Sequence, residues 1–375
     1  MLRKGKDNGE MKICFLLGGL TANGGIGRVT TMLANQLAQA EENDISILSY
    51  FSSDDPILYP VDATVKLDYL LDKRESMISF LLRGGERKLR QYLQYNQIDL
   101  LVACGALFFP LAVRAARKVK TECFCWEHTD PRGNHDYRMQ QYARLYGIKR
   151  SAWNVVLTKA ALSIYRKEYH VNNVCQIYNP VDDRILNNQA SYNARSKKII
   201  SVGRLTYQKN FQQAVQIAAQ ILPRYPEWHW DVYGEGTERA ELEALIQKYR
   251  LENQMHLKGQ VNDLYSRYRE YRMMVMTSRY EGFPMTLLEG MGSGLPLISF
   301  DVPTGPNEII MDGDNGFLIP SDDMDRMVKS IERLMNDAEL CVEMSETGLA
   351  QCNQFSTLLI AKQWATLFRK FCEQK

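Results

Sequence analysis

Two glutamates and the segment between them carry the clearest chemistry in the chain. Glu281 and Glu289 enclose seven residues that begin Gly282-Phe283-Pro284-Met285-Thr286. The apolar residues 273–276 before them are expected to form a buried parallel strand, and a helix is expected to begin at Pro284, which fits a first helical turn. A strand, a glycine loop and a helix in succession point backbone N–H groups at an anion. Carboxylates beside such a site suit sugar hydroxyls, so the segment predicts a nucleotide-sugar pocket.

A second expected strand-to-helix loop carries two cations. Residues 199–202 are expected to form a strand, and Gly203-Arg204-Leu205-Thr206-Tyr207-Gln208-Lys209-Asn210 follows it before a helix from Phe211. Arginine offers a planar fork of donors and lysine a point charge, so both on one loop suit a diphosphate. A further strand at 230–233 ends at Gly234, which we expect at the edge of the same nucleotide pocket.

These segments resemble the signature of the retaining glycosyltransferases of family 4, which have the GT-B fold of two facing Rossmann-like domains with parallel sheets and an interdomain cleft. The resemblance implies that Glu289 holds the ribose hydroxyls and Glu281 the hydroxyls of the donor sugar. It also implies that Arg204 and Lys209 neutralise the diphosphate leaving group. It is dense over residues 199–320 and thin over 50–120, so donor chemistry has more support than acceptor identity.

The resemblance further implies how the reaction proceeds. The backbone of residues 282–286 would surround the sugar and phosphates, and attack would come from the front face with the leaving phosphate taking the acceptor proton, so we name no general base. Asp312 and Asp314 form a nominal DxD metal motif, but Asp-Gly-Asp-Asn-Gly before a strand is typical of a turn. Since Arg204 and Lys209 can offset the leaving charge, we expect no metal and no other cofactor.

A glycine-rich loop follows the first expected strand, residues 11–17. It contains Gly25 and Gly27 and leads into a helix, as the phosphate loop of a dinucleotide-binding oxidoreductase would. The third glycine of GxGxxG is missing, however, and Leu48-Ser49-Tyr50 supply no acidic residue for a ribose. In family 4 the corresponding loop lies over the donor diphosphate and borders the acceptor cleft, a role that the resemblance assigns to Gly25 and Gly27.

His128 lies where the expected strand 122–126 ends. Ligands bind at such strand ends in this architecture, so a functional role competes with a purely structural one. Family 4 enzymes have a similar Glu-His pair here, with the histidine near the donor sugar and the reacting hydroxyl. We therefore predict a catalytic role for His128, with weaker support for Glu127 and Asp130.

Alternating strands and helices predict two parallel α/β domains. Residues 1–10 are polar and without periodicity, and we expect a disordered tail there. The acceptor-binding domain is expected over 11–180 and the linker over 181–198, because Pro180 forces an extended chain before a polar run. The nucleotide-sugar-binding domain follows over 199–355. The resemblance implies that a helix at 356–375 crosses back to the first domain.

Composition limits the compartment and the partners. With 45% hydrophobic and 24% charged residues and no apolar run long enough for a bilayer, we expect a cytoplasmic protein. The eight cysteines include no CxxC, and alternating Cys123 and Cys125 suggest buried thiols, so we expect neither disulfides nor zinc. Basic residues are not interleaved with stacking aromatics, which argues against nucleic acid.

The first half of the chain is the basic half. Residues 1–180 contain 24 Lys and Arg against 18 Asp and Glu, and residues 73–90 mix apolar side chains with six of these cations. Such a stretch suits either an exposed amphipathic helix packed on its own domain or a helix lying on an anionic membrane. Peripheral contact with the inner face of the cytoplasmic membrane therefore remains open.

We conclude that the sequence predicts a metal-independent, retaining hexosyltransferase. The sequence from Glu281 to Thr304 also resembles that of bacterial enzymes that build lipopolysaccharide, capsule or lipid-linked oligosaccharide. This favours UDP-galactose, UDP-GlcNAc or UDP-GalNAc as donor and a glycan or lipid-linked glycan as acceptor. The alternatives are a GDP-sugar-dependent mannosyltransferase, a GT-B sugar-nucleotide epimerase, a nicotinamide oxidoreductase and a non-catalytic nucleotide-sugar binding module.

Overall fold

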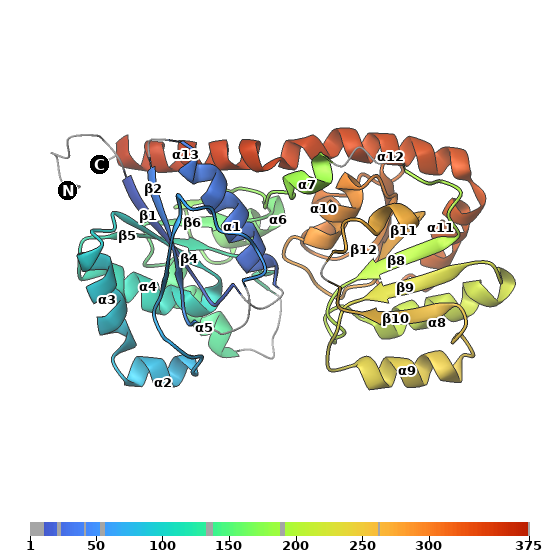
Figure 1. Ribbon diagram of the computed structural model, residues 1–375, viewed down its shortest axis with the longest axis horizontal. Coiled ribbons are helices and arrows are strands. Elements are labelled where there is room, and N and C mark those ends of the chain that lie inside the picture. The colour runs from blue at the N-terminus through green and yellow to red at the C-terminus, as the bar shows by residue number, and fades with distance from the viewer. Residues whose placement is uncertain are drawn as a thin grey trace. The chain divides into compact units, whose positions relative to one another are not determined.

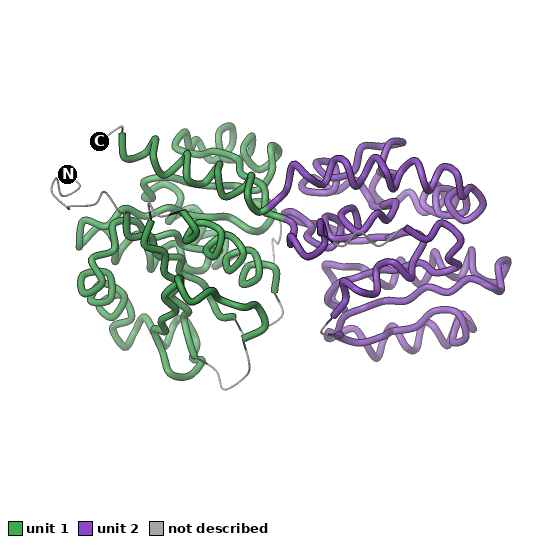
Figure 2. Tube along the Cα trace, turned by 45° about the horizontal axis from the view of Figure 1, so that its top comes forward, with its two compact units in different colours: residues 1–180, 357–375 green, residues 181–356 purple. Residues whose placement is uncertain are grey.

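The computed structural model describes residues 11–20, 24–40, 43–52, 57–132, 138–187, 192–261 and 263–373. The tail predicted at residues 1–10 lies outside this part of the chain. Strands and helices alternate along most of the chain (Figure 1). The fold divides into two compact units, residues 1–180 with 357–375 (unit 1) and residues 181–356 (unit 2) (Figure 2).

Unit 1 is built on a seven-stranded parallel sheet. Its strand order is β3-β2-β1-β4-β5-β6-β7, so the order reverses direction between β1 and β4. The inner strand β1 is buried from Ile13 to Leu17, as expected for a strand covered by helices on both faces. Phe15 of β1 pairs with Ile47 on one side and Val102 on the other. The strands are β1 (Met11–Leu17), β2 (Asn43–Ser49), β3 (Lys66–Tyr69), β4 (Leu100–Cys104), β5 (Glu122–Trp126), β6 (Trp153–Val156) and β7 (Val174–Gln176).

The helices of unit 1 include one from the far end of the chain. Helix α13 (Thr357–Glu373) packs Trp364 against Trp126 of β5 and Phe15 of β1, with ring centroids 4.8 and 6.3 Å apart. All three side chains are buried, so the last helix completes the core of unit 1. The other helices are α1 (Gly25–Ala38), α2 (Met77–Leu82), α3 (Gly85–Tyr95), α4 (Phe109–Arg117), α5 (Arg138–Ile148) and α6 (Lys159–Lys167).

Unit 2 has a six-stranded parallel sheet of the same design. Its order is β10-β9-β8-β11-β12-β13, which reverses direction between β8 and β11. The four residues of β11 are all buried, which explains their uninterrupted apolar sequence. The strands are β8 (Lys198–Val202), β9 (His229–Tyr233), β10 (Met255–Gly259), β11 (Met273–Met276), β12 (Leu297–Asp301) and β13 (Gly316–Pro320).

Helix α8 of unit 2 buries one stripe of its surface in the core of the unit. In α8 the buried side chains of Phe211, Ala214, Val215, Ala218 and Ile221 recur at helical spacing and form that stripe. The helices are α7 (Asp183–Leu186), α8 (Phe211–Ile221), α9 (Arg239–Lys248), α10 (Met285–Gly292), α11 (Met324–Asn336) and α12 (Ala338–Cys352). The predicted class, two Rossmann-like α/β domains with parallel sheets, is confirmed.

Three local features differ from the sequence-based expectation. The amphipathic helix expected within residues 73–90 is two helices, α2 and α3, because Gly84 between them has a φ of 87° that ends the first helix. Strands β3 and β7 were not predicted, since β3 has no buried residue and β7 is only three residues long. Residues 181–187 belong to unit 2, and α7 among them packs on α10.

The cysteine side chains are free thiols. All eight cysteines are unpaired in the structure, and Cys123 and Cys125 are buried as predicted. Within the described ranges, no helix combines the length and the apolar content needed to cross a membrane.

Candidate active site

The site residues of unit 2 lie where the strand order reverses. Strands β8 and β11 are neighbours, and their onward connections lead to opposite edges of the sheet, so the loops after them diverge from a topological switch point. The loop after β8 is residues 203–210, and the loop after β11 is residues 277–284. Ligands in open α/β sheets bind at this position, and it is where both motifs with chemistry fall.

Lys209 and Glu281 join these two loops. The Lys209 Nζ lies 2.6 Å from a carboxylate oxygen of Glu281, and both side chains are largely buried. The Thr277 hydroxyl donates to the backbone oxygen of Lys209 at 3.1 Å, and the Thr304 hydroxyl donates to that of Glu281. Sequence reasoning singled out Lys209 and Glu281 separately; the structure pairs them.

This ion pair has a defined chemical capacity. A buried ammonium next to a carboxylate at a strand end offers a donor for phosphate oxygens and an acceptor for sugar hydroxyls at one point. Each ion also offsets the burial cost of the other while no ligand is bound. The pair therefore holds both side chains in place at the strand end.

Glu289 is held by a tyrosine that the sequence did not single out. The glutamate is 2% exposed on the second turn of α10, and the Tyr268 hydroxyl donates to its Oε2 at 2.7 Å. Tyr268 is itself buried and begins a short 3₁₀ helix, Tyr268–Glu270, ahead of β11. Tyr268 lies in a polar stretch of the sequence that contains no motif. Its aromatic side chain, which favours burial, was the only signal that could have pointed to it.

Arg204 is the exposed cation of the first loop. Its Nη2 lies 3.4 Å from the side-chain oxygen of Gln208, whose amide nitrogen donates to the backbone oxygen of Tyr280 at 3.0 Å. The backbone N–H of Arg279 donates to the backbone oxygen of Gln208 at 2.8 Å. Gln208 thus ties the two loops together beside Arg204, and the sequence analysis had assigned it no role.

Two predicted glycines bring backbone segments into contact. Gly234 has a φ of 137°, and a Cβ there would lie 1.9 Å from the backbone oxygen of Gly203. A Cβ on Gly203 would in turn lie 3.1 Å from the Lys209 side chain. The loops after β8 and β9 therefore touch through backbone atoms at a point where only glycine fits.

The segment between the two glutamates is closely packed. Phe283, Pro284 and Met285 are buried, whereas Gly282 and Thr286 are half-buried. Pro284 is the N-cap of α10, one position before the first turn in which we expected it. Gly305, with a φ of 100°, lies under this segment, where a Cβ would come within 2.6 Å of the Pro284 ring.

Gly25 and Gly27 belong to unit 1, in the first turn of α1. Gly25 is exposed and begins the helix, and Gly27 is buried, where a Cβ would lie 3.2 Å from the backbone oxygen of Gly19. The middle of the glycine-rich loop, residues 21–23, lies outside the described residues. The loop follows β1, at the point where the strand order of this sheet reverses.

His128 follows β5 at the same carboxyl edge of the unit 1 sheet. It is half-buried, its ring lies 4.3 Å from that of Trp126, and its Nε2 is buried without a hydrogen-bond partner among the described residues. Burial lowers the pKa of His128 to about 4, against an opposing effect of the neighbouring Glu127 carboxylate. The ring is therefore a neutral imidazole at pH 7, able to accept or donate one hydrogen bond.

Glu127 has a structural task. Its carboxylate is buried, pairs with the buried Arg144 of α5 and accepts hydrogen bonds from the hydroxyls of Thr129 and Tyr165 at 2.8 and 3.2 Å. Although burial opposes it, Arg144 lowers the pKa of Glu127 below its ordinary value. This network fixes the backbone on either side of His128 and leaves Glu127 no need of a ligand.

Two other features lie apart from these residues. Asp312 accepts a backbone hydrogen bond from Leu318 at 2.9 Å across a turn in which Gly313 has a φ of 90°, so the predicted turn is confirmed.

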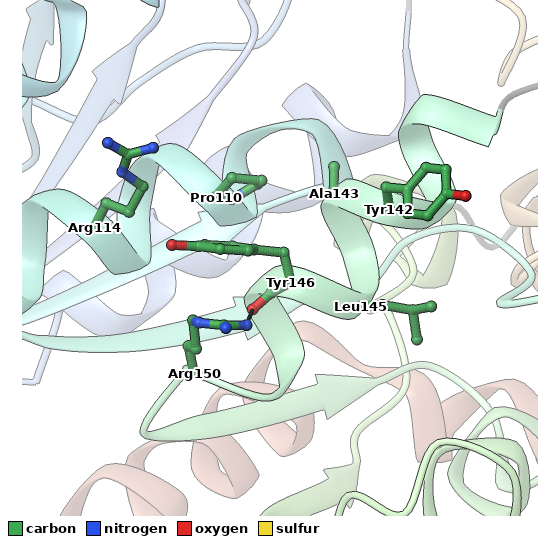
Figure 3. A pocket seen from close by; sticks show the side chains of 7 residues that line it. All are labelled: Pro110, Arg114, Tyr142, Ala143, Leu145, Tyr146 and Arg150. Carbon is green, nitrogen blue, oxygen red and sulfur yellow. Dashed lines mark hydrogen bonds between the residues drawn. The ribbon is translucent and has the colours of Figure 1, made fainter.

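A pocket of about 500 Å³ opens between α4 and α5 of unit 1 (Figure 3). Its Arg150 stacks on Tyr146 at 4.1 Å, and none of the predicted site residues lines it.

Comparison with protein families agrees with this architecture. Residues 23–184 match the model of Glycosyltransferase Family 4, and residues 182–351 match that of Glycosyl transferases group 1. Together the two models cover most of both units. The chain belongs to the GT-B glycosyltransferases, and the predicted enzyme class, a hexosyltransferase, is confirmed.

Individual relatives match along almost the whole chain. A glycosyltransferase of Haemophilus influenzae is 25% identical over 94% of this chain and 98% of its own. The amylovoran biosynthesis glycosyltransferase AmsD of Erwinia amylovora is 28% identical over the same shares. Crystal structures of Staphylococcus aureus TarM with UDP and of Anabaena HepE with UDP and glucose share the fold. Their TM-scores are 0.83 and 0.81 at 16% identity, over 96% of this chain and 99% of each of theirs.

Proposed function

We propose that this protein transfers a hexose from a UDP-sugar, with retention of configuration and without a metal, to a glycan or lipid-linked glycan in bacterial cell-envelope polysaccharide synthesis. The observation that carries the proposal is the buried Lys209–Glu281 pair at the strand reversal of unit 2, on the loop that also presents Arg204. A sugar diphosphate is the ligand that needs both a carboxylate for hydroxyls and two cations for phosphate.

Each residue has a distinct task in this proposal. Glu289 binds the ribose hydroxyls, and Glu281 binds hydroxyls of the donor sugar. Arg204 and Lys209 bind the diphosphate and stabilise the negative charge that grows as the glycosidic bond breaks, which is electrostatic stabilisation of the transition state. The backbone of residues 282–286 surrounds the sugar and phosphates, and the departing phosphate takes the proton of the acceptor hydroxyl.

Arg204 and Lys209 can take the place of a metal ion, because they offset the charge of the leaving group. A diphosphate leaving group gains negative charge, and Arg204 with Lys209 supplies two positive charges at the strand end. In unit 1, we propose that Gly25 and Gly27 border the acceptor and that neutral His128 contacts a sugar hydroxyl. Its unpartnered Nε2 supports this assignment, because a buried ring nitrogen without a partner is stabilised by a ligand that bonds to it.

The names of relatives support the choice of donor and process. The fold neighbours TarM and HepE are described with UDP, and the S. pneumoniae transferase GtfA with UDP and GlcNAc. AmsD is named for amylovoran biosynthesis, and an S. aureus relative for transfer of N-acetylglucosamine to poly(ribitol-phosphate). We therefore favour UDP-galactose, UDP-GlcNAc or UDP-GalNAc, and a cytoplasmic site of action at the inner face of the membrane.

Thermal shift in the presence of EDTA tests the donor directly. UDP should raise the melting temperature more than GDP, ADP or NAD, and Arg204→Ala or Glu289→Ala should abolish the rise. Arg326→Ala, which removes another exposed cation of unit 2 that pairs with Asp312, is the control and should keep the rise. UDP release from a panel of UDP-hexoses then identifies the sugar.

The other outcomes distinguish the alternatives. A response to GDP alone would indicate a mannosyltransferase, and a response to NAD alone an oxidoreductase. UDP binding without release of UDP in the presence of acceptor would indicate a binding module, and conversion of a UDP-sugar to its epimer would indicate an epimerase. A UDP response that appears only with added divalent metal would contradict the metal-independent mechanism.

A further inference from the structure

The pocket of unit 1 lies between two helices that touch closely at one point. Gly147 of α5 leaves room for Phe109 of α4, because a Cβ on the glycine would lie 2.2 Å from the Phe109 Cβ. Both residues are buried, so this contact fixes the distance between the helices. Side chains of α4 and α5, with Arg150 after α5, enclose a volume of about 500 Å³ (Figure 3). This volume lies in the range of small-molecule sites.

The lining of the pocket is mainly apolar and aromatic. Pro110 of α4 and Ala143 of α5 contribute apolar surface, and Tyr142 and Tyr146 contribute two aromatic rings. The spacing of four residues places both tyrosines on one side of α5. Tyr142 is 73% exposed and Tyr146 is half-buried, so both rings are accessible to a ligand. An exposed aromatic side chain beside a hollow is typical of a binding surface.

Two arginines flank the inner tyrosine of this pocket. Figure 3 shows the ring of Tyr146 edge-on between Arg114 and Arg150. The Arg150 guanidinium lies 4.1 Å from the centroid of that ring, and its Nη1 donates to the backbone oxygen of Tyr146 at 3.1 Å. Among the described residues, no carboxylate forms an ion pair with Arg150. The guanidinium is therefore held in place while it still has N–H donors for an anion.

The surroundings of the pocket are positively charged. Helices α4 and α5 contain no Asp or Glu, and Lys149 and Arg150 directly follow α5. Arg114 pairs with Glu86 of α3 at 2.8 Å, but Glu86 also pairs with Lys118 at 2.7 Å. One carboxylate thus faces two cations and leaves a net positive charge. The pocket therefore favours a negatively charged ligand.

We propose that the α4–α5 pocket, meaning the space lined by Pro110, Arg114, Tyr142, Tyr146 and Arg150, binds an anionic sugar unit of a glycan. The C–H face of a pyranose ring is apolar and packs on the tyrosine rings. Arg150 offers paired N–H donors to the carboxylate or phosphate of that unit. A neutral sugar would leave the cations unused, and an inorganic anion would leave the aromatic surface unused. The two features together select an acidic sugar.

This site goes beyond the proposed transfer reaction. It contains no residue that we assign to donor or acceptor binding, so the sugar unit that it holds is not the one that reacts. Failure of the proposed UDP-sugar transfer would leave glycan binding at the α4–α5 pocket untouched, and the reverse also holds. If the proposed function is correct, the pocket retains a second part of an acidic acceptor or product chain on unit 1.

Isothermal titration calorimetry of the full chain tests the proposal. Trigalacturonate, an acidic trisaccharide, should bind, and neutral maltotriose should bind at least about tenfold more weakly because it lacks the charge-assisted hydrogen bonds. Rising salt should weaken the binding of trigalacturonate. The double variant Tyr142→Ser/Arg150→Gln should lose at least about tenfold in affinity, since it removes an aromatic surface and a charged donor. Glucose 6-phosphate as a second probe distinguishes a phosphorylated sugar from a uronate.

A matched control lies on α3 of the same unit. Tyr95 is 87% exposed and Arg87 is an exposed cation, and neither lines the pocket. Tyr95→Ser/Arg87→Gln makes the same two kinds of change and should bind trigalacturonate like the unaltered chain. Melting temperatures of both double variants show whether the fold is intact.

Four results would overturn the proposal. The first is absence of binding by both acidic sugars, and the second is equal affinity of the two double variants for the sugar that binds. The third is competition by inorganic phosphate as strong as that of the sugar itself, which would reduce the pocket to a simple anion site. The fourth is loss of binding in Arg204→Ala with retention in the pocket variant, which would assign the ligand to the candidate active site.

Discussion

Tyr268 should control the affinity for the nucleotide although it carries no charge. Its hydroxyl donates to Oε2 of the buried Glu289 at 2.7 Å, and a hydrogen bond to a charged group contributes about 1.5–3 kcal/mol. Tyr268→Phe removes the donor and keeps the ring. For a unit of this size, 2–4 °C is lost for each kcal/mol, so its melting temperature should fall by about 3–12 °C.

The same change should weaken binding of UDP. Without the phenol, the Glu289 carboxylate loses one hydrogen bond that orients it toward the proposed ribose position, and a loss of ~1.4 kcal/mol lowers affinity about tenfold. Isothermal titration calorimetry with UDP measures this affinity, and chemical unfolding measures stability in parallel. Both effects together are the signature of a positioning residue.

Tyr271→Phe is the matched control. Its hydroxyl is also buried, donates to Asp231 at 2.7 Å and lies 2.8 Å from the Tyr233 hydroxyl, away from Glu289. It should lose stability to a similar extent while keeping the affinity for UDP. The reasoning fails if Tyr268→Phe binds UDP as tightly as the unaltered protein, or if both variants lose affinity equally.

Three further predictions follow from the site and its surroundings. Lys209→Ala leaves the Glu281 carboxylate buried and unpaired, which should cost about 3–5 kcal/mol in urea unfolding, and Lys209→Met/Glu281→Gln should recover most of this stability but not UDP release. The pKa of His128 is about 4 in the folded protein and 6.5 ordinarily, so the unfolded chain takes up the proton first as pH falls. The free energy of unfolding should therefore be highest above pH 6.5 and should fall between pH 6.5 and pH 4. Thermal unfolding across this pH range measures the effect, which should be absent in His128→Asn. Gly234→Ala should destabilise the fold by more than ~2 kcal/mol in urea unfolding because its Cβ would lie 1.9 Å from a backbone oxygen, whereas Gly313→Ala, with a φ of 90° but open space, should cost only about 1 kcal/mol.

Much of the fold could be predicted because the signals were local. Strand β5 was predicted at residues 122–126, where it lies, since a short apolar run between helical patterns is typical of a buried parallel strand. Strand β3 has half-buried and exposed residues at the sheet edge and offers no such run. The break between α2 and α3 depends on the backbone angle of Gly84, and a glycine in a helical pattern does not by itself reveal a left-handed residue.

The site could be predicted only as far as its motifs extend. Glu281, Lys209 and Arg204 stand in recognisable strand-to-helix loops, but their spacing along the chain does not show that Lys209 and Glu281 form a pair. That pairing depends on β8 and β11 being neighbours, which is a property of the strand order. Tyr268 and Gln208 act through single hydrogen bonds between segments far apart in sequence, and no local pattern encodes such contacts.

The packing of α13 sets the order in which the protein can fold during synthesis. Unit 2 is a continuous segment, and its two ends are held together, since the backbone N–H of Val181 donates to the backbone oxygen of Phe355 at 2.8 Å. It can fold as soon as residue 356 has left the ribosome. Unit 1 is made first yet must wait, because Trp364 is missing from its core until the final helix emerges. The half of the enzyme that is translated first is therefore completed last, and nascent chains are expected to expose the apolar surface around Phe15 and Trp126 to chaperones until translation reaches α13.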